Sequence, residues 1–207
     1  MIYKIRKGQE DFAEGPVSAV TALQMFSTYK DIFDKRGLAY HEAMLKYPHA
    51  RSHEFESILE QALVQSGQTL CDMPSGGGYI QRFIQPENVK LLCIEPSTAF
   101  FDICASNHNS HKILCPLDQT PISSGSVDAV ISLAGLHHAE NTPGIFREMH
   151  RIFKHDGRLC IADVETGSST DDFLDVFVNA NSSMGHTGQY RSWHVRELSH
   201  DRVSHHF

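Results

Sequence analysis

The chain has few basic residues and no long apolar run. Among its 207 residues, 18 lysines and arginines stand against 25 aspartates and glutamates, so the formal net charge is −7. A protein that binds nucleic acid through its phosphates needs a basic surface, and this balance argues against DNA or RNA as a partner. The longest apolar stretch, residues 128–136, is far shorter than the roughly 20 residues that cross a bilayer. We therefore expect no membrane-spanning helix.

A secretion signal and paired cysteines are also lacking. Residues 1–12 carry charges with no apolar segment behind them, which predicts a cytoplasmic protein. The five cysteines are odd in number and none forms a Cys-x-x-Cys pair, so we expect neither a disulfide framework nor a metal site. Histidines are plentiful, at 14, and five of them fall in the last 22 residues, but their spacing fits no metal-ligand template.

Short apolar runs alternate with amphipathic segments along most of the chain. Apolar residues at helical spacing predict helices over residues 17–35 and 53–65. We expect strands at five apolar runs, residues 69–73, 90–94, 112–115, 126–133 and 158–164, and further helices at residues 79–84, 97–105, 143–153 and 171–180. Within the helix over residues 143–153, Thr142 is the expected N-cap and Gly157 the stop. Apolar strands that alternate with helices predict an α/β fold, a Rossmann-like three-layer sandwich with a mostly parallel sheet.

A glycine cluster, Gly76–Gly78, follows the first expected strand. Consecutive glycines between a strand and a helix allow positive φ angles and let a ligand lie against the backbone beside an amide-rich helix N-terminus. The second strand ends in Glu95, 23 residues after Asp72, where an acidic side chain accepts both hydroxyls of a ribose. A dinucleotide fingerprint starting at the cluster requires glycine at position 81, which is Gln81. This favours an adenosine cofactor other than a nicotinamide dinucleotide.

These residues resemble the class I S-adenosylmethionine-dependent methyltransferases, in particular the type 11 small-molecule group that includes the quinone-biosynthesis enzymes. The acid and spaced glycines of that family are matched by Asp72, Gly76 and Gly78, with Pro74 in place of the first glycine. The similarity continues in order through CIEPS (93–97), PISSGSVDAVISLAGLHH (121–138) and FREMHRIFKHDGRLCIADV (146–164). In terms of motifs it covers about residues 53–165, and four motifs in one order are specific.

The resemblance implies S-adenosyl-L-methionine as cofactor, S-adenosyl-L-homocysteine as product, and the strand order 3-2-1-4-5 for the five expected strands. It also implies a cofactor site made by residues at the strand ends: Asp72, Pro74, Ser75, Gly76, Gly78, Glu95, Pro96, Leu117, Asp118, Ser132, Leu133 and Ala134. After the fourth strand, His137 and His138 are candidate catalytic bases, because an imidazole accepts a proton near neutral pH. Tyr29, Tyr40 and Tyr47 are candidates to close over the cationic sulfonium.

We expect one domain over residues 1–207. It divides into three parts: an N-terminal helical lid region (1–52), a cofactor-binding core (53–165) and a short C-terminal extension (166–207). The family normally adds two strands after the fifth, but the polar tail holds no apolar run for them. The fifth strand is then expected at the sheet edge, covered by the helix over residues 171–180 with Trp193 or by a second copy of the chain in a homodimer.

Three functions are compatible with these patterns. The leading one is methyl transfer from S-adenosylmethionine to a small-molecule acceptor with an oxygen, nitrogen or carbon nucleophile. The second is a non-catalytic binding or scaffold protein that keeps the fold, which Pro74 and the missing strands favour. The third is a nicotinamide-dependent oxidoreductase, but the only Tyr-x-x-x-Lys pair, Tyr3 and Lys7, precedes the glycine cluster rather than following it.

Overall fold

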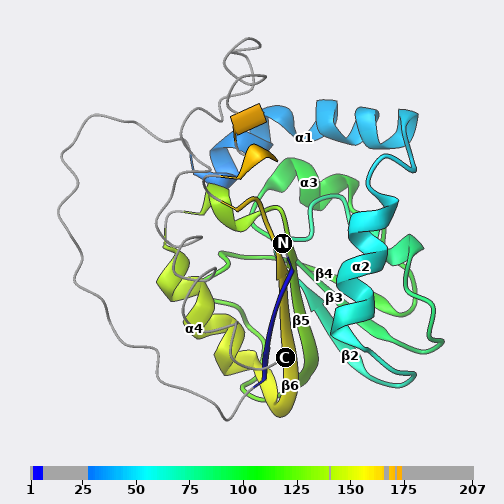
Figure 1. The fold of residues 1–207 in the computed structure, drawn as a ribbon, viewed down its shortest axis with the longest axis vertical. Helices are drawn as coiled ribbons and strands as arrows, with labels where there is room; N and C mark the ends of the chain where they lie inside the picture. The colour runs from blue at the N-terminus through cyan, green and yellow to red at the C-terminus, as the bar shows by residue number, and fades with distance from the viewer. Residues whose placement is uncertain (1, 7–27, 140, 166–167, 171, 174–207) are drawn as a thin grey trace, which may run out of the picture.

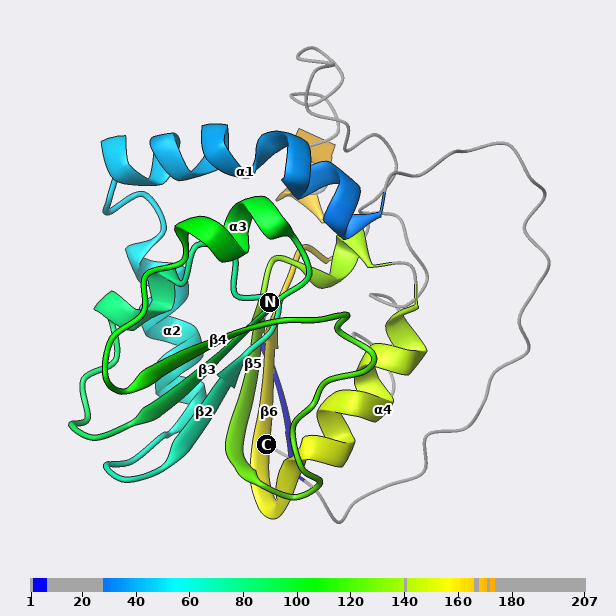
Figure 2. The same cartoon turned by 180° about the vertical axis from the view of Figure 1, so that it is seen from behind.

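The computed structural model describes residues 2–6, 28–139, 141–165, 168–170 and 172–173. They form a six-stranded sheet with helices on both faces (Figures 1 and 2). The strands are β1 (Ile2–Arg6), β2 (Thr69–Asp72), β3 (Lys90–Glu95), β4 (Ser110–Leu114), β5 (Val127–Leu133) and β6 (Phe153–Ala162). The helices are α1 (Tyr29–Lys46), α2 (Ser52–Ala62), α3 (Thr98–Ile103) and α4 (Thr142–Ile152), with 3₁₀ turns η1 (Tyr79–Arg82) and η2 (Leu136–His138).

The five strands expected from the apolar runs are all present and mutually parallel. The sheet order is β1-β6-β5-β2-β3-β4, and β2 pairs in parallel with both β3 and β5. The pairs β3–β4 and β5–β6 are parallel as well. Counted from β2, this order is 3-2-1-4-5, which confirms the expected Rossmann-like fold.

The edge of the sheet beside β6 differs from the expectation. β1 pairs antiparallel with β6, from Ile2 opposite Ala162 to Arg6 opposite Arg158. The fifth expected strand is therefore not an edge strand, and residues 2–6 form a strand although they were placed in the helical N-terminal region. Backbone pairing with β1 satisfies the N–H and C=O groups that an open edge would expose. Among the described residues no strand follows β6, and Trp193, with most of the helix expected over residues 171–180, lies outside them.

The helix boundaries in the structure also differ by a few residues from those expected from the sequence. Of the helix expected over residues 17–35, residues 17–27 lie outside the described part, and α1 starts at Tyr29. The N-cap of α4 is Asn141, whose side chain accepts a hydrogen bond from the Gly144 amide, and Thr142 is the first helical residue. Gly157 does not end α4, because the chain enters β6 directly at Phe153.

Two hydrophobic cores lie on the two faces of the sheet. Neighbouring residues of a strand point to opposite faces, so Val130 and Ile131 of β5 belong to different cores. On one face Val130 packs with Met149 of α4, and on the other Ile131 packs with Ile58 of α2. The parallel strands are therefore covered on both sides, as their continuous apolar runs predict.

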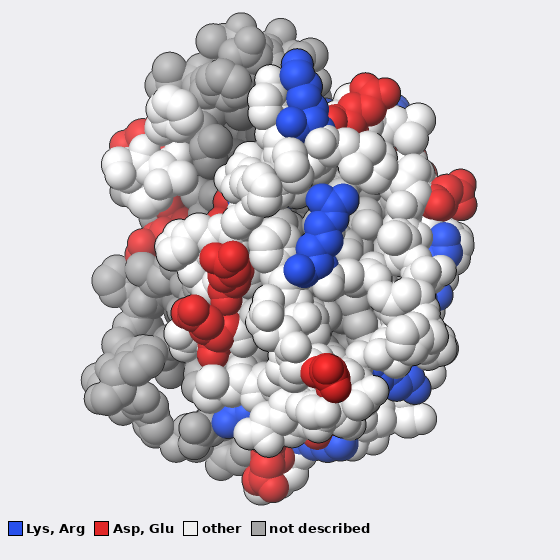
Figure 3. All heavy atoms as spheres, turned by 90° about the vertical axis from the view of Figure 1, so that its right-hand side faces the viewer, with Lys and Arg blue, Asp and Glu red and all other residues white. Residues whose placement is uncertain are grey.

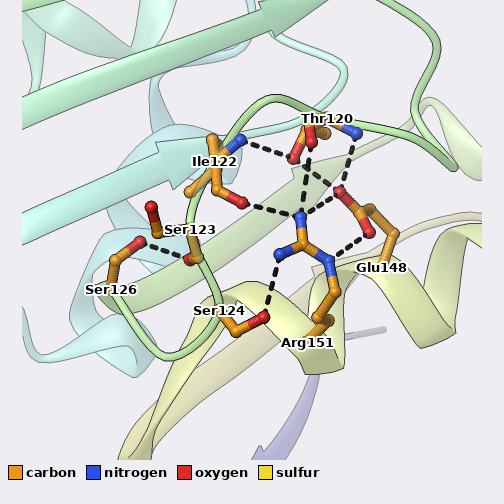
Figure 4. A network of polar contacts seen from close by, with 7 residues as sticks. All are labelled: Thr120, Ile122, Ser123, Ser124, Ser126, Glu148 and Arg151. Carbon is orange, nitrogen blue, oxygen red and sulfur yellow. Dashed lines mark hydrogen bonds and ion pairs between the residues drawn. The ribbon is translucent and has the colours of Figure 1, made fainter.

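An ion pair within α4, between Glu148 and Arg151, is hydrogen-bonded to the loop before β5 (Figure 4). Arg151 donates from Nε and Nη2 to the carboxylate of Glu148, at 2.7 Å each, and from Nη2 to the carbonyl oxygen of Ile122 at 2.7 Å. The same carboxylate accepts hydrogen bonds from the amide and the hydroxyl of Thr120, at 2.7 and 2.6 Å. The bonds from Arg151 and Thr120 lower the pKa of Glu148 to about 2. This network holds the entry to β5 against α4.

The face of the molecule in Figure 3 carries charged side chains of both signs, set singly or in small groups among uncharged ones.

Within the described residues, no helix is both long enough and apolar enough to cross a membrane.

Candidate active site

A glycine loop follows β2 and turns sharply. After the cis peptide bond between Met73 and Pro74, Gly76 has a φ of +53° and Gly78 a φ of +70°, values in the left-handed region that favours glycine. A Cβ atom on Gly78 would lie 2.6 Å from Nε2 of Gln81 and 2.7 Å from Sγ of Cys104. Gly76 is therefore favoured by its backbone conformation, and Gly78 by both its conformation and the space around it.

The carboxylate of Glu95, at the end of β3, lies against this loop. Its Oε2 accepts hydrogen bonds from the amide of Gly76 at 2.7 Å and the hydroxyl of Tyr29 at 3.2 Å. Its Oε1 accepts one from the amide of Ser97 at 2.8 Å. Glu95 is 0% exposed, and burial raises its pKa to about 8 although the three donors act in the other direction. The site thus holds a carboxyl group that is largely protonated at neutral pH.

A second buried acid, Asp72, lies at the end of β2. Burial, followed by the nearby Cys104 and Glu95, raises the pKa of Asp72 well above its ordinary value. Two acids with raised pKa values in one place indicate a region from which water is excluded, and such groups are common at functional sites.

Helix α1 lies over the ends of the strands and begins at this site (Figure 2). The ring of Tyr29, whose hydroxyl reaches Glu95, packs on Phe33 with 4.6 Å between ring centroids. Phe33 in turn contacts Phe100 of α3 at 5.0 Å and the ring of His138 at 5.1 Å. Aromatic side chains from α1 therefore cover the loop, β3 and η2 together.

The start of α3 provides a second anchor for α1. Asp34 accepts hydrogen bonds from the hydroxyl of Ser97 at 2.9 Å and the amide of Thr98 at 2.8 Å. A carboxylate at a helix N-terminus is stabilised by the free amides there. Of the other tyrosines proposed to cover the site, Tyr40 packs against Phe100 at 5.7 Å, whereas Tyr47 is 57% exposed beyond the end of α1.

The two candidate bases, His137 and His138, are buried in η2 directly after β5. Nδ1 of His137 lies 2.6 Å from Oδ1 of Asp163, which follows β6. A Cβ atom on Gly135, just before η2, would overlap the ring of Pro74. The turn that carries the histidines is therefore in contact with the turn that carries the glycines.

The remaining residues expected at the site divide into two groups. Ser75 and Ser132 are buried, and Pro96, Leu133 and Ala134 are half-buried at the same strand ends. Leu117 packs in the hydrophobic core on the α4 face, and Asp118 is exposed, where it accepts a hydrogen bond from Nδ2 of Asn141 at 2.8 Å. The ends of β2, β3 and β5 thus come together, while Asp118 serves to hold the N-cap of α4.

Two contacts at the site were not expected from the sequence. Tyr29 and Glu95 are 66 residues apart, and Asp34 and Ser97 are 63 apart. Nothing in the local pattern of α1 distinguishes these side chains from other polar residues on a helix, so only the tertiary arrangement shows their role.

Comparisons with known proteins agree with this geometry. Residues 71–161 match a family model described as "Methyltransferase domain". One curated relative, "Ubiquinone/menaquinone biosynthesis C-methyltransferase UbiE" of Rubrivivax gelatinosus, is 24% identical over 107 residues, which are 50% of this chain and 43% of that protein. This chain therefore spans less than half the length of the curated relative it matches.

Solved structures share the fold. Haemonchus contortus "Phospholethanolamine N-methyltransferase 2", solved with phosphomonomethylethanolamine and S-adenosylhomocysteine, has a TM-score of 0.63 at 16% identity, over 84% of this chain and 43% of that one. A possible histamine N-methyltransferase from Thermotoga maritima has a TM-score of 0.58 at 19% identity, over 72% and 68%. The [4+2]-cyclase SpnF has a TM-score of 0.61 at 15% identity, over 72% and 67%. By its sequence motifs, its matched domain over residues 71–161 and its fold, the chain is similar to the class I S-adenosylmethionine-dependent methyltransferases.

Proposed function

We propose that this chain binds S-adenosylmethionine at the ends of β2, β3 and β5 and transfers its methyl group to a small-molecule acceptor. The observation that supports this most is the buried carboxylate of Glu95 beside the left-handed glycines Gly76 and Gly78. An acid at the end of the second parallel strand, next to a glycine turn, is suited to hold the ribose of an adenosine cofactor.

In this proposal, the ribose hydroxyls compete with the protein's own donors for the hydrogen-bond acceptor positions of Glu95. In the ionised form, which the ribose hydroxyls favour, the Glu95 carboxylate offers about four acceptor positions, two on each oxygen. Three are used, by the amides of Gly76 and Ser97 and the hydroxyl of Tyr29. Two ribose hydroxyls need two positions, so the Tyr29 hydroxyl has to leave when they bind. In this proposal the first turn of α1 moves aside as the cofactor enters.

Methyl transfer from this cofactor requires little acid–base catalysis by the protein. When bound, the cofactor supplies a methyl group on a positively charged sulfur that already makes it a good electrophile. The protein's own residues orient the acceptor and exclude water. Phe33 and Tyr29 cover the site with aromatic rings, whose faces attract a cation. His137, at the end of β5, accepts the proton that the acceptor loses.

A small acceptor is favoured by two features. The net charge of −7 gives no electrostatic attraction to nucleic acid. The side chains of α1 pack directly over the strand ends, with Phe33 bridging Phe100 and His138. An acceptor that reaches His137 has to fit beneath that helix.

Calorimetry with S-adenosylmethionine, S-adenosylhomocysteine and NAD tests the cofactor proposal. We expect the two adenosyl compounds to bind and NAD not to. Glu95→Ala should weaken adenosyl binding about 10- to 100-fold, because a hydrogen bond to a charged group contributes roughly 1.5–3 kcal/mol and 1.4 kcal/mol is tenfold. Glu87→Ala, which removes an exposed carboxylate in the loop before β3, is the matched control and should have no effect. Equal affinities of wild type and Glu95→Ala would remove Glu95 from the site.

Methyl transfer is tested with S-adenosylmethionine labelled on its methyl group. Label should appear in the low-molecular-weight fraction of a cell extract and not in its protein or nucleic acid fractions. His137→Ala should lower that transfer about 100-fold with cofactor affinity unchanged, since general bases typically contribute at least that much. Label that appears only in macromolecules would contradict a small acceptor.

A binding protein without methyl transfer is the second candidate. Pro74 replaces the first glycine of the family pattern, and its ring fills the space beside Gly135. The [4+2]-cyclase SpnF, which has a similar fold, is not named as a methyltransferase. Tight binding of S-adenosylmethionine with no label transferred to any fraction would favour this candidate.

A further inference from the structure

Helix α1 makes a second contact near the site, far along the helix from Tyr29. Nδ1 of His41, in α1, and the hydroxyl oxygen of Tyr79, the first residue of η1, are 3.0 Å apart. Their rings stack, with 5.9 Å between centroids and 25° between planes. Because an α-helix rises 1.5 Å per residue, the stretch of α1 from Tyr29 to His41 is roughly 18 Å long. Helix α1 is therefore held at two well-separated points.

The ring of Tyr79 lies directly on the glycine loop. A Cβ atom on Gly77 would lie 2.5 Å from Cζ and 2.6 Å from Oη of this ring, and one on Gly76 would lie 3.9 Å from its Cε2. The hydroxyl end of the ring thus packs against the backbone of the central glycine. Tyr79 is 6% exposed, and burial raises the pKa of its hydroxyl, which keeps its proton and can hydrogen-bond a histidine.

Neighbouring contacts hold this part of α1 in place. The ring of Tyr40 lies 6.1 Å from that of Tyr79, and its hydroxyl accepts a hydrogen bond from Nη1 of Arg51 at 2.6 Å. Arg51 is the N-cap residue of α2 and also donates from Nε to Glu54 at 3.0 Å. The middle of α1 is thus tied to α2 as well as to Tyr79, independently of its first turn.

A restraint on the glycine loop bears on ligand affinity. Gly76 and Gly78 have positive φ angles, and glycine loses more conformational freedom on becoming ordered than other residues do. A loop that is already held in its bound form binds more tightly, because less ordering is needed when the ligand arrives. The ring of Tyr79 on Gly77 restrains the loop in this way.

We propose that Tyr79 is a positioning residue for the cofactor: it holds the Gly76–Gly78 loop in the form that binds the adenosyl group, and α1 fixes Tyr79 through His41. This inference rests on the proposed function. The Tyr29 hydroxyl leaves Glu95 when the ribose binds, whereas the His41–Tyr79 contact remains and keeps α1 beside the loop. Helix α1 thus has one contact that the cofactor displaces and one that prepares the loop for it.

NMR of the full chain labelled with ¹³C and ¹⁵N in glycine alone observes the loop directly. The Gly76–Gly78 loop contains the only Gly-Gly pairs of the sequence. An experiment that correlates each amide with the carbonyl carbon before it therefore detects the second and third glycines of the loop and no other residue. In the free protein, we expect His41→Ala to move both signals away from the positions they take when S-adenosylhomocysteine is bound to the wild type.

Affinity for S-adenosylhomocysteine is the reading that a merely structural contact would not move. Calorimetry should show about fivefold weaker binding for His41→Ala and for Tyr79→Phe, which keeps the ring, because each removes one hydrogen bond between neutral groups. The double variant should bind no more weakly than either single variant, since both lose the same contact. His49→Ala removes an exposed histidine beyond the end of α1, so it is the matched control and should change neither the affinity nor the loop signals.

The outcomes separate this inference from the proposed function. Unchanged affinity in both single variants, additive losses in the double variant, or loop signals that stay in place in His41→Ala would overturn the inference while the wild type still binds the ligand. If the wild type does not bind S-adenosylhomocysteine, the proposed function fails, and the role of Tyr79 in cofactor binding fails with it. Should His41→Ala not fold, the affinity of Tyr79→Phe decides alone, and wild-type affinity in that variant would overturn the inference.

Discussion

Cofactor affinity should depend on pH through Glu95. Burial raises the pKa of Glu95 to about 8, so about nine tenths of the molecules carry its proton at pH 7. Ribose hydroxyls donate hydrogen bonds, which favour the ionised carboxylate. Binding is therefore expected to release the proton, and affinity should rise with pH until Glu95 is ionised in the free protein.

The size of this effect follows from the pKa. Between pH 7 and pH 9 the ionised fraction of a group with a pKa of 8 rises about tenfold, so the Kd for S-adenosylhomocysteine should fall about tenfold, or about 1.4 kcal/mol. Calorimetry at several pH values, in pairs of buffers with different heats of ionisation, measures both the Kd and the protons released. At pH 7 we expect about 0.9 proton released per ligand bound through Glu95.

Glu95→Gln is the control, because it keeps the size of the side chain and cannot titrate. The ligand carries a titrating amino group of its own, which contributes equally to both proteins. The difference between wild type and Glu95→Gln therefore isolates the carboxyl group. If both proteins show the same pH dependence and the same proton release, the reasoning about Glu95 is refuted.

Three further predictions test the contacts around the site and the sheet. Tyr29→Phe removes a hydrogen bond to Glu95 that, in this proposal, exists only before the ribose binds. Calorimetry should therefore show adenosyl binding about fivefold tighter, which corresponds to roughly 1 kcal/mol. Weaker binding would show that the hydroxyl holds the cofactor instead. Arg151→Met leaves the Glu148 carboxylate with fewer hydrogen-bond donors, so it should lower the free energy of unfolding in urea by about 1–3 kcal/mol. An unchanged free energy of unfolding would mean that the network in Figure 4 does not stabilise the fold. Deletion of residues 1–6 exposes the edge of β6, so its amide hydrogens should exchange faster; unchanged exchange would argue against the β1–β6 pairing.

The sheet could be predicted from the sequence because its signals are local. Apolar runs that end in Asp72 and Glu95 indicated two adjacent strand ends, and the glycines after the first run indicated the turn between strand and helix. Their order and parallel pairing appear in the structure as expected. Strand β1 was missed because five residues, IYKIR, show an alternating pattern too short to stand out, and their partner lies more than 150 residues away.

The site was predictable only in part. Residues at strand ends are placed by the sheet, so Asp72, Glu95 and the His137 turn come together as the topology requires. The contacts made by α1 depend on how that helix docks, which no local spacing encodes. Asp118, a cofactor contact implied only by the resemblance, is exposed and accepts a hydrogen bond from Asn141 at the N-cap of α4, a contact that no local spacing predicted.

A crystal structure of the chain with S-adenosylhomocysteine tests the central claim most directly. We predict the adenosyl group at the Gly76–Gly78 loop, both ribose hydroxyls within hydrogen-bond distance of the Glu95 carboxylate, and the Tyr29 hydroxyl no longer bound to it. An adenosyl group bound elsewhere, or ribose hydroxyls held by other groups while Tyr29 stays on Glu95, would contradict the claim.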